Sequence, residues 1–226
     1  METTAVIVAR GGSKRLPGKN LLDINGETLI SRKIRQLLAV SNIDRVVVGS
    51  DDADILAVGE ASGAEAIQRP DFFCDEAQAT ANQMIGNMCE LIDTDVVVWA
   101  HCTNPLLSTG TYERAVNAYV EAGAAGYDSL LSVFALREHL WDASKKPFNY
   151  NPYGPVHPPA SSLPPLYAQD GGIFIQPHKQ MLANRYFFGA VPFLFEIPTD
   201  ELMDINNPHD FVLAKAYIEK TEGAKP

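Results

Sequence analysis

Four cations and three glycines lie together in one short segment near the start of the chain, ARGGSKRLPGKN at residues 9–20. Glycine allows backbone conformations in which successive N–H groups point at one anion, and Arg and Lys side chains add charge-assisted hydrogen bonds to phosphate oxygens. The chain as a whole is acidic, because 18 Lys and Arg stand against 28 Asp and Glu, which gives a net charge of −10. The segment therefore predicts a polyphosphate-binding loop, with a solvated basic turn as the alternative.

Two familiar phosphate-binding loops do not match this segment. A Walker A loop requires the pattern G-x-x-x-x-G-K-[ST], but Ser13 stands five residues before Gly18, and Asn20 follows Lys19. The dinucleotide fingerprint G-x-G-x-x-G is absent as well. The predicted loop is therefore of another kind.

The segment at residues 9–20 resembles the signature of the acylneuraminate cytidylyltransferase family, which is similar to the wider group of sugar nucleotidyltransferases. Further resemblances follow in the family's order and extend over nearly the whole chain. They are Ser50-Asp51, Gln68-Arg69-Pro70, TNPL at 103–106, LPPLY at 163–167 followed by DGGIFI at 170–175, and MDIN at 203–206 with Asp210-Phe211.

The resemblance implies transfer of CMP from CTP to the anomeric hydroxyl of an acidic 3-deoxy-2-ulosonic sugar, a nine-carbon sialic-acid-like compound, with release of pyrophosphate. Such a displacement at phosphorus is catalysed mainly by alignment and by neutralisation of growing charge. The implied catalytic residues are Lys19, Arg10 and Asp204, and Asp204 with Asn206 would hold Mg²⁺. The implied nucleotide-binding residues are Ala9, Arg10, Gly11, Ser13, Lys14, Arg15, Lys19, Asn20, Arg69, Asn82 and His101. The implied acceptor-binding residues are Thr103, Asn104, Tyr167 and Asp170.

The sequence also departs from the family pattern. Asn206 stands where the family has a second acid, so one carboxylate remains for a hard cation in this motif. Ser161 and Ser162 stand where a basic residue is common, and Asp170 replaces an Asn. Two alternatives therefore stay open. One is a nucleotidyltransferase of the same fold that acts on an eight-carbon ulosonic acid or a phosphonate, and the other is a nucleotide-binding protein that has lost turnover.

Several of these residues also have a purely structural interpretation. His101 could face the base or be satisfied by the backbone, and Arg69 could contact the nucleotide or form a surface ion pair. Asp51 and Asp52 could order a ligand or cap the next helix. For Asp210 we favour a helix-start acid over a metal ligand.

The elements that must position these residues alternate along the chain. Apolar, β-branched runs predict strands at 3–9, 45–50, 64–68, 95–100 and 129–135, and helical periodicity predicts helices at 28–40, 53–61, 78–92, 110–121 and 208–220. This order predicts a Rossmann-like, three-layer α/β fold whose mostly parallel sheet has helices on both faces. Ligands bind beyond the carboxyl ends of such strands, so the loops after Ala9, Ser50, Gln68 and Ala100 are expected to converge on one site.

One segment interrupts this alternation of strands and helices. Seven of the fifteen prolines lie between Pro147 and Pro165, which excludes a helix or an inner strand there. We expect residues 1–226 to form one nucleotidyltransferase domain, with 136–167 as an extended arm that forms a homodimer interface. A mobile surface loop is the alternative.

Composition indicates the class of protein and the compartment it occupies. Hydrophobic residues at 46% and charged residues at 20% are typical of a globular protein. The negative charge argues against a nucleic-acid partner, and the lack of a long apolar run argues against a membrane span. Three cysteines without C-x-x-C spacing suggest reduced thiols. We therefore expect a soluble, cytoplasmic protein.

Overall fold

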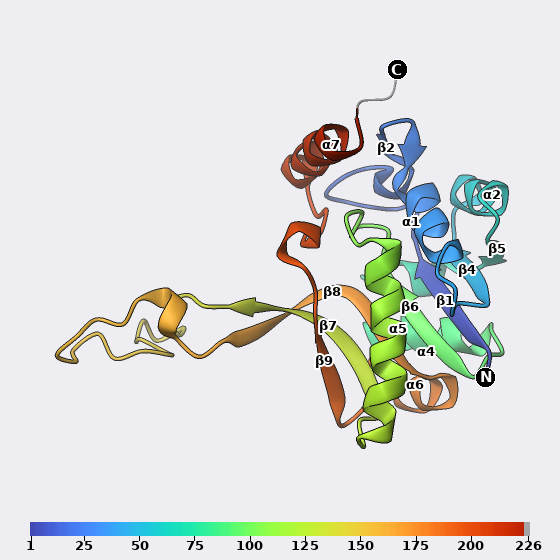
Figure 1. Ribbon diagram of the computed structural model, residues 1–226. Helices are drawn as coiled ribbons and strands as arrows, with labels where there is room; N and C mark the ends of the chain where they lie inside the picture. Colours follow the sequence, from blue (N-terminus) through green and yellow to red (C-terminus); the bar gives the residue numbers. More distant parts are fainter. Residues whose placement is uncertain (224–226) are drawn as a thin grey trace.

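The structure is a computed structural model that describes residues 1–223, so the last three residues of the expected domain lie outside it. A seven-stranded sheet forms its centre, in the order β5-β4-β1-β6-β8-β7-β9 (Figure 1). The strands are β1 (Thr3–Val8), β4 (Arg45–Ser50), β5 (Glu65–Gln68), β6 (Val96–Ala100), β7 (Ser129–Leu136), β8 (Leu166–Pro177) and β9 (Pro192–Glu196). A separate antiparallel pair consists of β2 (Asp23–Ile24) and β3 (Glu27–Thr28).

Helices connect these strands. They are α1 (Leu29–Leu38), α2 (Ala53–Ala61), α3 (Asp71–Cys74), α4 (Ala81–Glu90), α5 (Thr109–Ala124), α6 (His178–Asn184) and α7 (Pro208–Glu222). Short 3₁₀ turns lie at Lys19–Leu21, Ala160–Ser162 and Thr199–Glu201. All five predicted strands and all five predicted helices are present, with shifts at their ends.

The sheet is mostly parallel, as predicted. Strand β1 pairs in parallel with β4 and β6, β4 with β5, and β7 with β9, whereas β8 runs antiparallel to both of its neighbours. Successive side chains point to opposite faces, so Ala5 and Ile7 enter one apolar core and Val6 enters the other. Helices α1, α2, α5 and α7 contribute to the first core, and α4 and α6 to the second. The three-layer prediction is therefore confirmed.

The sequence did not predict β8, β9 or α6 as elements. Strand β8 contains Asp170, Gly171 and Gly172, residue types that are depleted in strands, and Gly171 has φ of 78°. Its pairing with β7 also shifts register between Leu131 and Val133. Tertiary pairing on both sides outweighs this poor local propensity.

Helix starts are set by capping side chains. The Thr80 Oγ1 accepts from the Gln83 N–H at 3.2 Å, and the Gln83 side chain accepts from the Thr80 N–H at 2.9 Å. This reciprocal box starts α4 at residue 81 and not at the predicted 78. Asp52 caps α2, and Asp210 accepts the N–H groups of Asn206 and Asn207 at 2.8 and 3.0 Å, which is the helix-start role favoured for it.

Residues 137–165 leave the sheet between β7 and β8 and extend away from the body (Figure 1). Their only helical turn in the structure is Ala160–Ser162. The rings of His139 and His157 stack with centroids 4.6 Å apart, and the segment pairs with itself between Trp141 and Pro147. We call residues 136–167 the arm. In residues 1–223 we find no helix with the length and apolar character needed to cross a membrane.

The cap of α7 provides a test of this local architecture. Asn207 accepts from the N–H groups of His209 and Asp210 at 2.9 and 3.1 Å. Asn207→Ala is expected to lower the free energy of unfolding in urea by about 1 kcal/mol, because it leaves these helix donors without a side-chain acceptor. Val212→Ala, at an exposed position of the same helix, is the control. Equal stability of the two variants would show that the cap contributes nothing.

Candidate active site

A cleft of about 380 Å³ opens at the carboxyl ends of β1 and β6. The loops after these two strands line it together, as expected from the parallel topology. The loop after β4 contacts the loop after β1, because the Gly11 N–H donates to the Asp51 carboxylate at 3.0 Å. Of the predicted site residues, the cleft brings together Arg10, Ser13, Lys14, Arg15, Lys19, Asn20, His101 and Thr103.

The loop after β1 is held in place by groups that are distant in sequence. A Cβ at Gly11 would collide with the Asp52 carboxylate, so the close approach requires glycine. Asn20 is buried, and its Nδ2 donates to the Arg10 carbonyl at 3.0 Å while its Oδ1 accepts from the Cys102 thiol at 3.0 Å. Burial raises the pKa of Cys102 to about 11, which keeps the thiol protonated as a donor. Both ends of the Asn20 amide are therefore used within the protein, and Asn20 positions the loop.

Two cations of the loop, Arg10 and Lys19, have an acidic and a carbonyl partner. Arg10 pairs with Glu76 at 3.0 Å, and the Lys19 ammonium donates to the Ile205 carbonyl at 3.0 Å. Burial lowers the pKa of Lys19 from its ordinary value, while the Asp204 carboxylate acts in the opposite direction. Glu76 was not predicted from the sequence, since it lies in the connection between α3 and α4 without a recognisable motif.

The segment at 203–206 lies beside these cations. Asn206 joins its two neighbours, because its Oδ1 accepts from Arg15 at 3.0 Å and its Nδ2 donates to the Asp204 carboxylate at 2.6 Å. Within residues 1–223 no three His, Cys, Asp or Glu side chains form a group that could hold a metal ion. Asp204 is the one carboxylate that the 203–206 segment supplies beside Lys19. Mg²⁺ is commonly bound in proteins through one or two carboxylates together with phosphate oxygens of a substrate. The Asn206 oxygen is directed to Arg15.

His101 lines the cleft, but both ring nitrogens are engaged. Nδ1 lies 2.6 Å from the Gly171 carbonyl, and Nε2 accepts from the Trp99 indole at 3.2 Å. These partners require a neutral ring with the proton on Nδ1, and burial, which lowers the pKa of His101, favours the same form. The backbone therefore satisfies one ring nitrogen of His101, as the structural interpretation expected, and the Trp99 side chain satisfies the other.

A second, more apolar pocket of about 300 Å³ adjoins the first and shares Val8, Arg10 and Glu76 with it. Arg69 lines this pocket from a fully buried position, where it donates to Asn87 at 3.1 Å and to the Met84 carbonyl at 3.3 Å. The interpretation of Arg69 as a surface ion pair is therefore wrong.

Asn82 lines neither pocket. It is exposed, and its Nδ2 donates to the Arg185 carbonyl at 2.8 Å. Its amide therefore joins α4 to the C-terminal end of α6, and the two pockets are lined without it.

The four predicted acceptor-binding residues have different surroundings. Thr103 lines the cleft, whereas Asn104 is buried and donates to the Met203 carbonyl at 3.1 Å, so its amide fixes the loop that carries Asp204. Tyr167 is half exposed at the base of the arm. Asp170 is half-buried next to Gly171, and burial raises the pKa of its carboxyl group.

Comparison with known proteins agrees with this geometry. A family model described as cytidylyltransferase matches residues 4–152. The pseudaminic acid cytidylyltransferase of Campylobacter jejuni strain NCTC 11168 is 26% identical over 228 residues, which cover 95% of each chain. The CMP-N,N'-diacetyllegionaminic acid synthase of Legionella pneumophila is 27% identical over 99% of each chain.

A similar fold occurs in a solved structure of CMP:2-keto-3-deoxy-manno-octonic acid synthetase with CTP, which has a TM-score of 0.69 at 16% identity and covers 97% of this chain and 99% of that one. The family model covers more than half of the sequence and includes the cationic loop after β1 and the loop after β6 that line the cleft. This chain therefore belongs to the cytidylyltransferase family and is a nucleotidyltransferase.

Proposed function

We propose that the enzyme transfers CMP from CTP to the anomeric hydroxyl of an acidic nine-carbon 3-deoxy-2-ulosonic sugar and releases pyrophosphate. The observation that carries this proposal is the cleft lined by the cationic loop, together with the Asp204 carboxylate that acts on Lys19. Full-length relatives named for pseudaminic and legionaminic acid support the acceptor class.

The two adjoining pockets suit the two parts of a nucleoside triphosphate. The more apolar pocket, with Phe73 and Arg69 in its wall, would take the base, and the cationic cleft would take the triphosphate. Arg10 lines both pockets, so it lies where base and phosphates would meet. A phosphate oxygen would replace Glu76 as the partner of Arg10, because the two kinds of anion compete for the same guanidinium.

The chemical step is a displacement at the α-phosphorus. The oxygen of the sugar hydroxyl forms a bond to this phosphorus and gives up its proton to solvent, the bond to the bridging oxygen breaks, and pyrophosphate leaves with the electron pair. Lys19 and Arg10 would neutralise charge that grows on the phosphoryl and leaving-group oxygens. The Ile205 carbonyl holds the Lys19 ammonium in place before the substrate arrives. Ordered in this way, the ammonium needs little reorganisation during the reaction.

We propose Mg²⁺ as the cofactor, with Asp204 as its protein ligand and the triphosphate supplying further oxygens. A bound divalent cation would supply charge neutralisation at the phosphates. Asn206 would act through its hydrogen bond to Asp204, which holds that carboxylate toward the cationic loop.

We further propose that the arm forms a homodimer interface and reaches the acceptor site of the partner. Trp141, Phe148 and Tyr153 are 56%, 63% and 88% exposed on it, and large aromatic side chains are enriched in protein interfaces. An eight-carbon ulosonic acid or a phosphonate is the second candidate acceptor. It stays a candidate because Ser161, Ser162 and Asn206 depart from the family pattern in the motifs that would bind the acceptor and the metal.

The direct test is release of pyrophosphate from each of the four nucleoside triphosphates with a panel of acceptors. Activity is expected with CTP and nine-carbon ulosonic acids. Activity confined to an eight-carbon acid or a phosphonate would show that this compound, and not a nine-carbon acid, is the acceptor. No turnover with any pair would contradict the proposal.

Lys19→Ala is expected to lower kcat by about 10²–10³, because the ammonium acts most strongly on charge in the transition state. CTP affinity should change much less. Steady-state kinetics and equilibrium CTP binding measure the two effects. Lys220→Ala, in the last turn of α7, is the matched control. Turnover of Lys19→Ala within a few-fold of wild type would remove Lys19 from the chemical step.

Asp204→Asn is expected to abolish the divalent-cation-dependent activity, because it removes the carboxylate from the 203–206 segment. Asn206→Asp should shift the magnesium titration to lower concentration if residue 206 lies at the metal. The titration of each variant is compared with wild type. A curve for Asn206→Asp that coincides with the wild-type curve would place residue 206 outside the coordination sphere.

Replacing residues 154–163 by a short flexible linker tests the arm. The sedimenting species should shift from dimer to monomer, and KM for the sugar should rise more than KM for CTP. Circular dichroism and CTP binding report whether the α/β body remains folded. An unchanged dimer with unchanged sugar kinetics would show that the arm is only a surface loop.

A further inference from the structure

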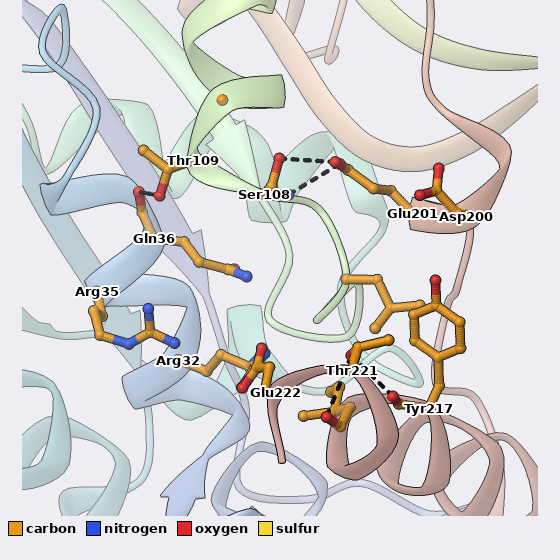
Figure 2. Close-up of a pocket in the computed structure, with 13 residues that line it drawn as sticks. Arg32, Arg35, Gln36, Ser108, Thr109, Asp200, Glu201, Tyr217, Thr221 and Glu222 are labelled. Carbon is orange, nitrogen blue, oxygen red and sulfur yellow. Dashed lines mark hydrogen bonds and ion pairs between the residues drawn. The ribbon is translucent and has the colours of Figure 1, made fainter.

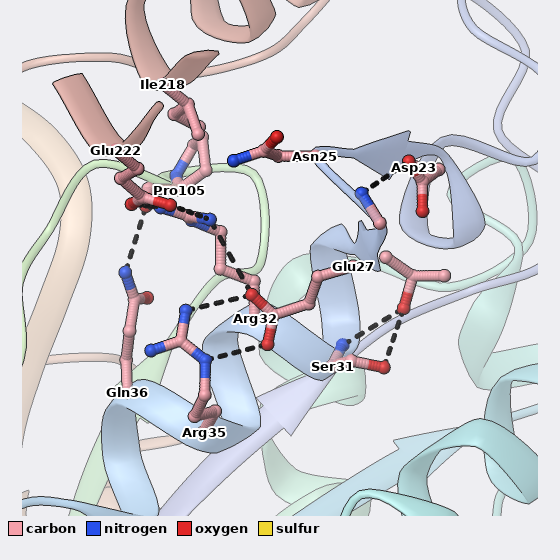
Figure 3. A network of polar contacts seen from close by, with 12 residues as sticks. Asp23, Asn25, Glu27, Ser31, Arg32, Arg35, Gln36, Pro105, Ile218 and Glu222 are labelled. Carbon is pink, nitrogen blue, oxygen red and sulfur yellow. Dashed lines mark hydrogen bonds and ion pairs between the residues drawn. The ribbon is translucent and has the colours of Figure 1, made fainter. Parts of the chain in front are cut away.

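A separate pocket of about 510 Å³ lies between α1, the start of α5, the Thr199–Glu201 turn and α7 (Figure 2). Arg32 and Gln36 line it from α1, and both donate to the Pro105 carbonyl, at 3.2 and 3.0 Å (Figure 3). The Arg32 guanidinium also contacts the Glu222 carboxylate of α7. These two side chains therefore join α1 to the connection after β6 where that connection borders the pocket.

Lys33 is a third polar side chain that α1 directs at this connection. Its ammonium donates to the Asn104 carbonyl, one residue before Pro105, at 2.9 Å. Lys33 is fully buried, and it lines neither this pocket nor the nucleotide cleft and the pocket beside it. Because no ligand can reach the ammonium, any effect on the reaction must pass through the residues that it contacts.

Burial makes this ammonium unfavourable for stability. Desolvation lowers the pKa of Lys33 from 10.5 to about 7. The centroid of the Tyr112 ring lies 4.7 Å from its Nζ, and within residues 1–223 the Asn104 carbonyl is its one hydrogen-bond acceptor. The titratable groups that act on it, from its own helix and three other elements, are Arg32, Cys102, Asp170 and Glu201. An apolar side chain of similar volume would avoid the desolvation of a charge, so stability does not explain a lysine here.

The connection after β6 is bonded in turn to the 203–206 segment. The Asn104 side chain donates to the Met203 carbonyl at 3.1 Å. The Ile205 N–H donates to the Thr103 carbonyl at 2.8 Å. Two hydrogen bonds therefore fix this segment against a connection whose own position depends on α1.

We propose that Lys33 is a positioning residue for the chemical step. By holding the connection after β6, it fixes residues 203–206. These place the Ile205 carbonyl against the Lys19 ammonium and carry the Asp204 carboxylate. The effect on the chemical step rests on the proposed function, whereas the effect on the backbone of residues 203–206 does not.

Lys33→Met removes the donor and keeps an unbranched side chain of similar volume. We expect kcat for pyrophosphate release to fall about tenfold or more, because a small displacement of aligned groups is costly. The magnesium titration should shift to higher concentration, and CTP affinity should change much less. Lys179→Met, at an exposed position of α6, makes the same change of charge and should equal wild type. Unchanged kcat and an unchanged magnesium titration in Lys33→Met would overturn the proposal.

The urea midpoint separates this role from a structural one. Below pH 7 the midpoint of Lys33→Met should equal or exceed that of wild type, because the variant no longer buries an ammonium. Its advantage should shrink as the pH rises from about 7 to 10.5, where the unfolded wild-type chain binds more protons than the folded one. A lower midpoint below pH 7 with wild-type kcat would assign Lys33 to stability alone.

Asn104→Leu removes the next link, the amide that donates to the Met203 carbonyl. If Lys33 acts through residue 104, the double variant should lose less kcat than the product of the two single losses, since both changes release the same segment. Single losses that multiply in the double variant would contradict this route.

Amide hydrogen exchange at residues 203–206 provides a readout that needs no turnover. It should be faster in Lys33→Met than in wild type and in Lys179→Met, because the acceptor of the Ile205 N–H is then held less firmly. Unchanged exchange in an enzyme that turns over would contradict the positioning role alone. Faster exchange in a protein that turns over no substrate would contradict the proposed function alone.

Discussion

Electrostatic repulsion within residues 10–19 is the constraint around which the active site is built. Four cations in ten residues repel one another when no phosphate is present. The structure offsets this with acceptors from segments far along the chain: Glu76 for Arg10, Asn206 for Arg15 and the Ile205 carbonyl for Lys19. Each of these contacts also fixes a cation at the edge of the cleft. The same contacts therefore stabilise the loop and prepare it for an anionic ligand.

A second group of polar side chains fixes the loops that line the cleft. Asn20 and Cys102 join the loop after β1 to the loop after β6, and His101 joins the latter to β8. Lys33 is fully buried, and desolvation lowers its pKa to about 7. Its ammonium donates to the Asn104 carbonyl at 2.9 Å and lies over the Tyr112 ring. These residues act on the chemistry by fixing backbone positions.

The segment 101–108 has a function on each of its two sides. His101 and Thr103 line the nucleotide cleft, while the Pro105 carbonyl and Ser108 meet the polar network of α1 and the Thr199–Glu201 turn. The segment 199–206 has the same double role, with Glu201 in one pocket and Asp204 beside Lys19. Two short connections thus run from the nucleotide cleft to a separate pocket between α1, the start of α5, the Thr199–Glu201 turn and α7.

The sequence by itself determined the order of the five predicted strands and helices, because apolar runs and capping residues act locally. It also identified the cationic loop, since glycines and cations close together in sequence remain close together in space. The tertiary structure alone decided the roles of Asn20, Arg69 and His101, whose partners come from other elements. It also placed Glu76 beside Arg10 and formed β8 against its poor propensity. Contacts between residues 70 to 191 positions apart leave no local pattern, so only the folded chain shows which polar groups face a ligand and which hold one another.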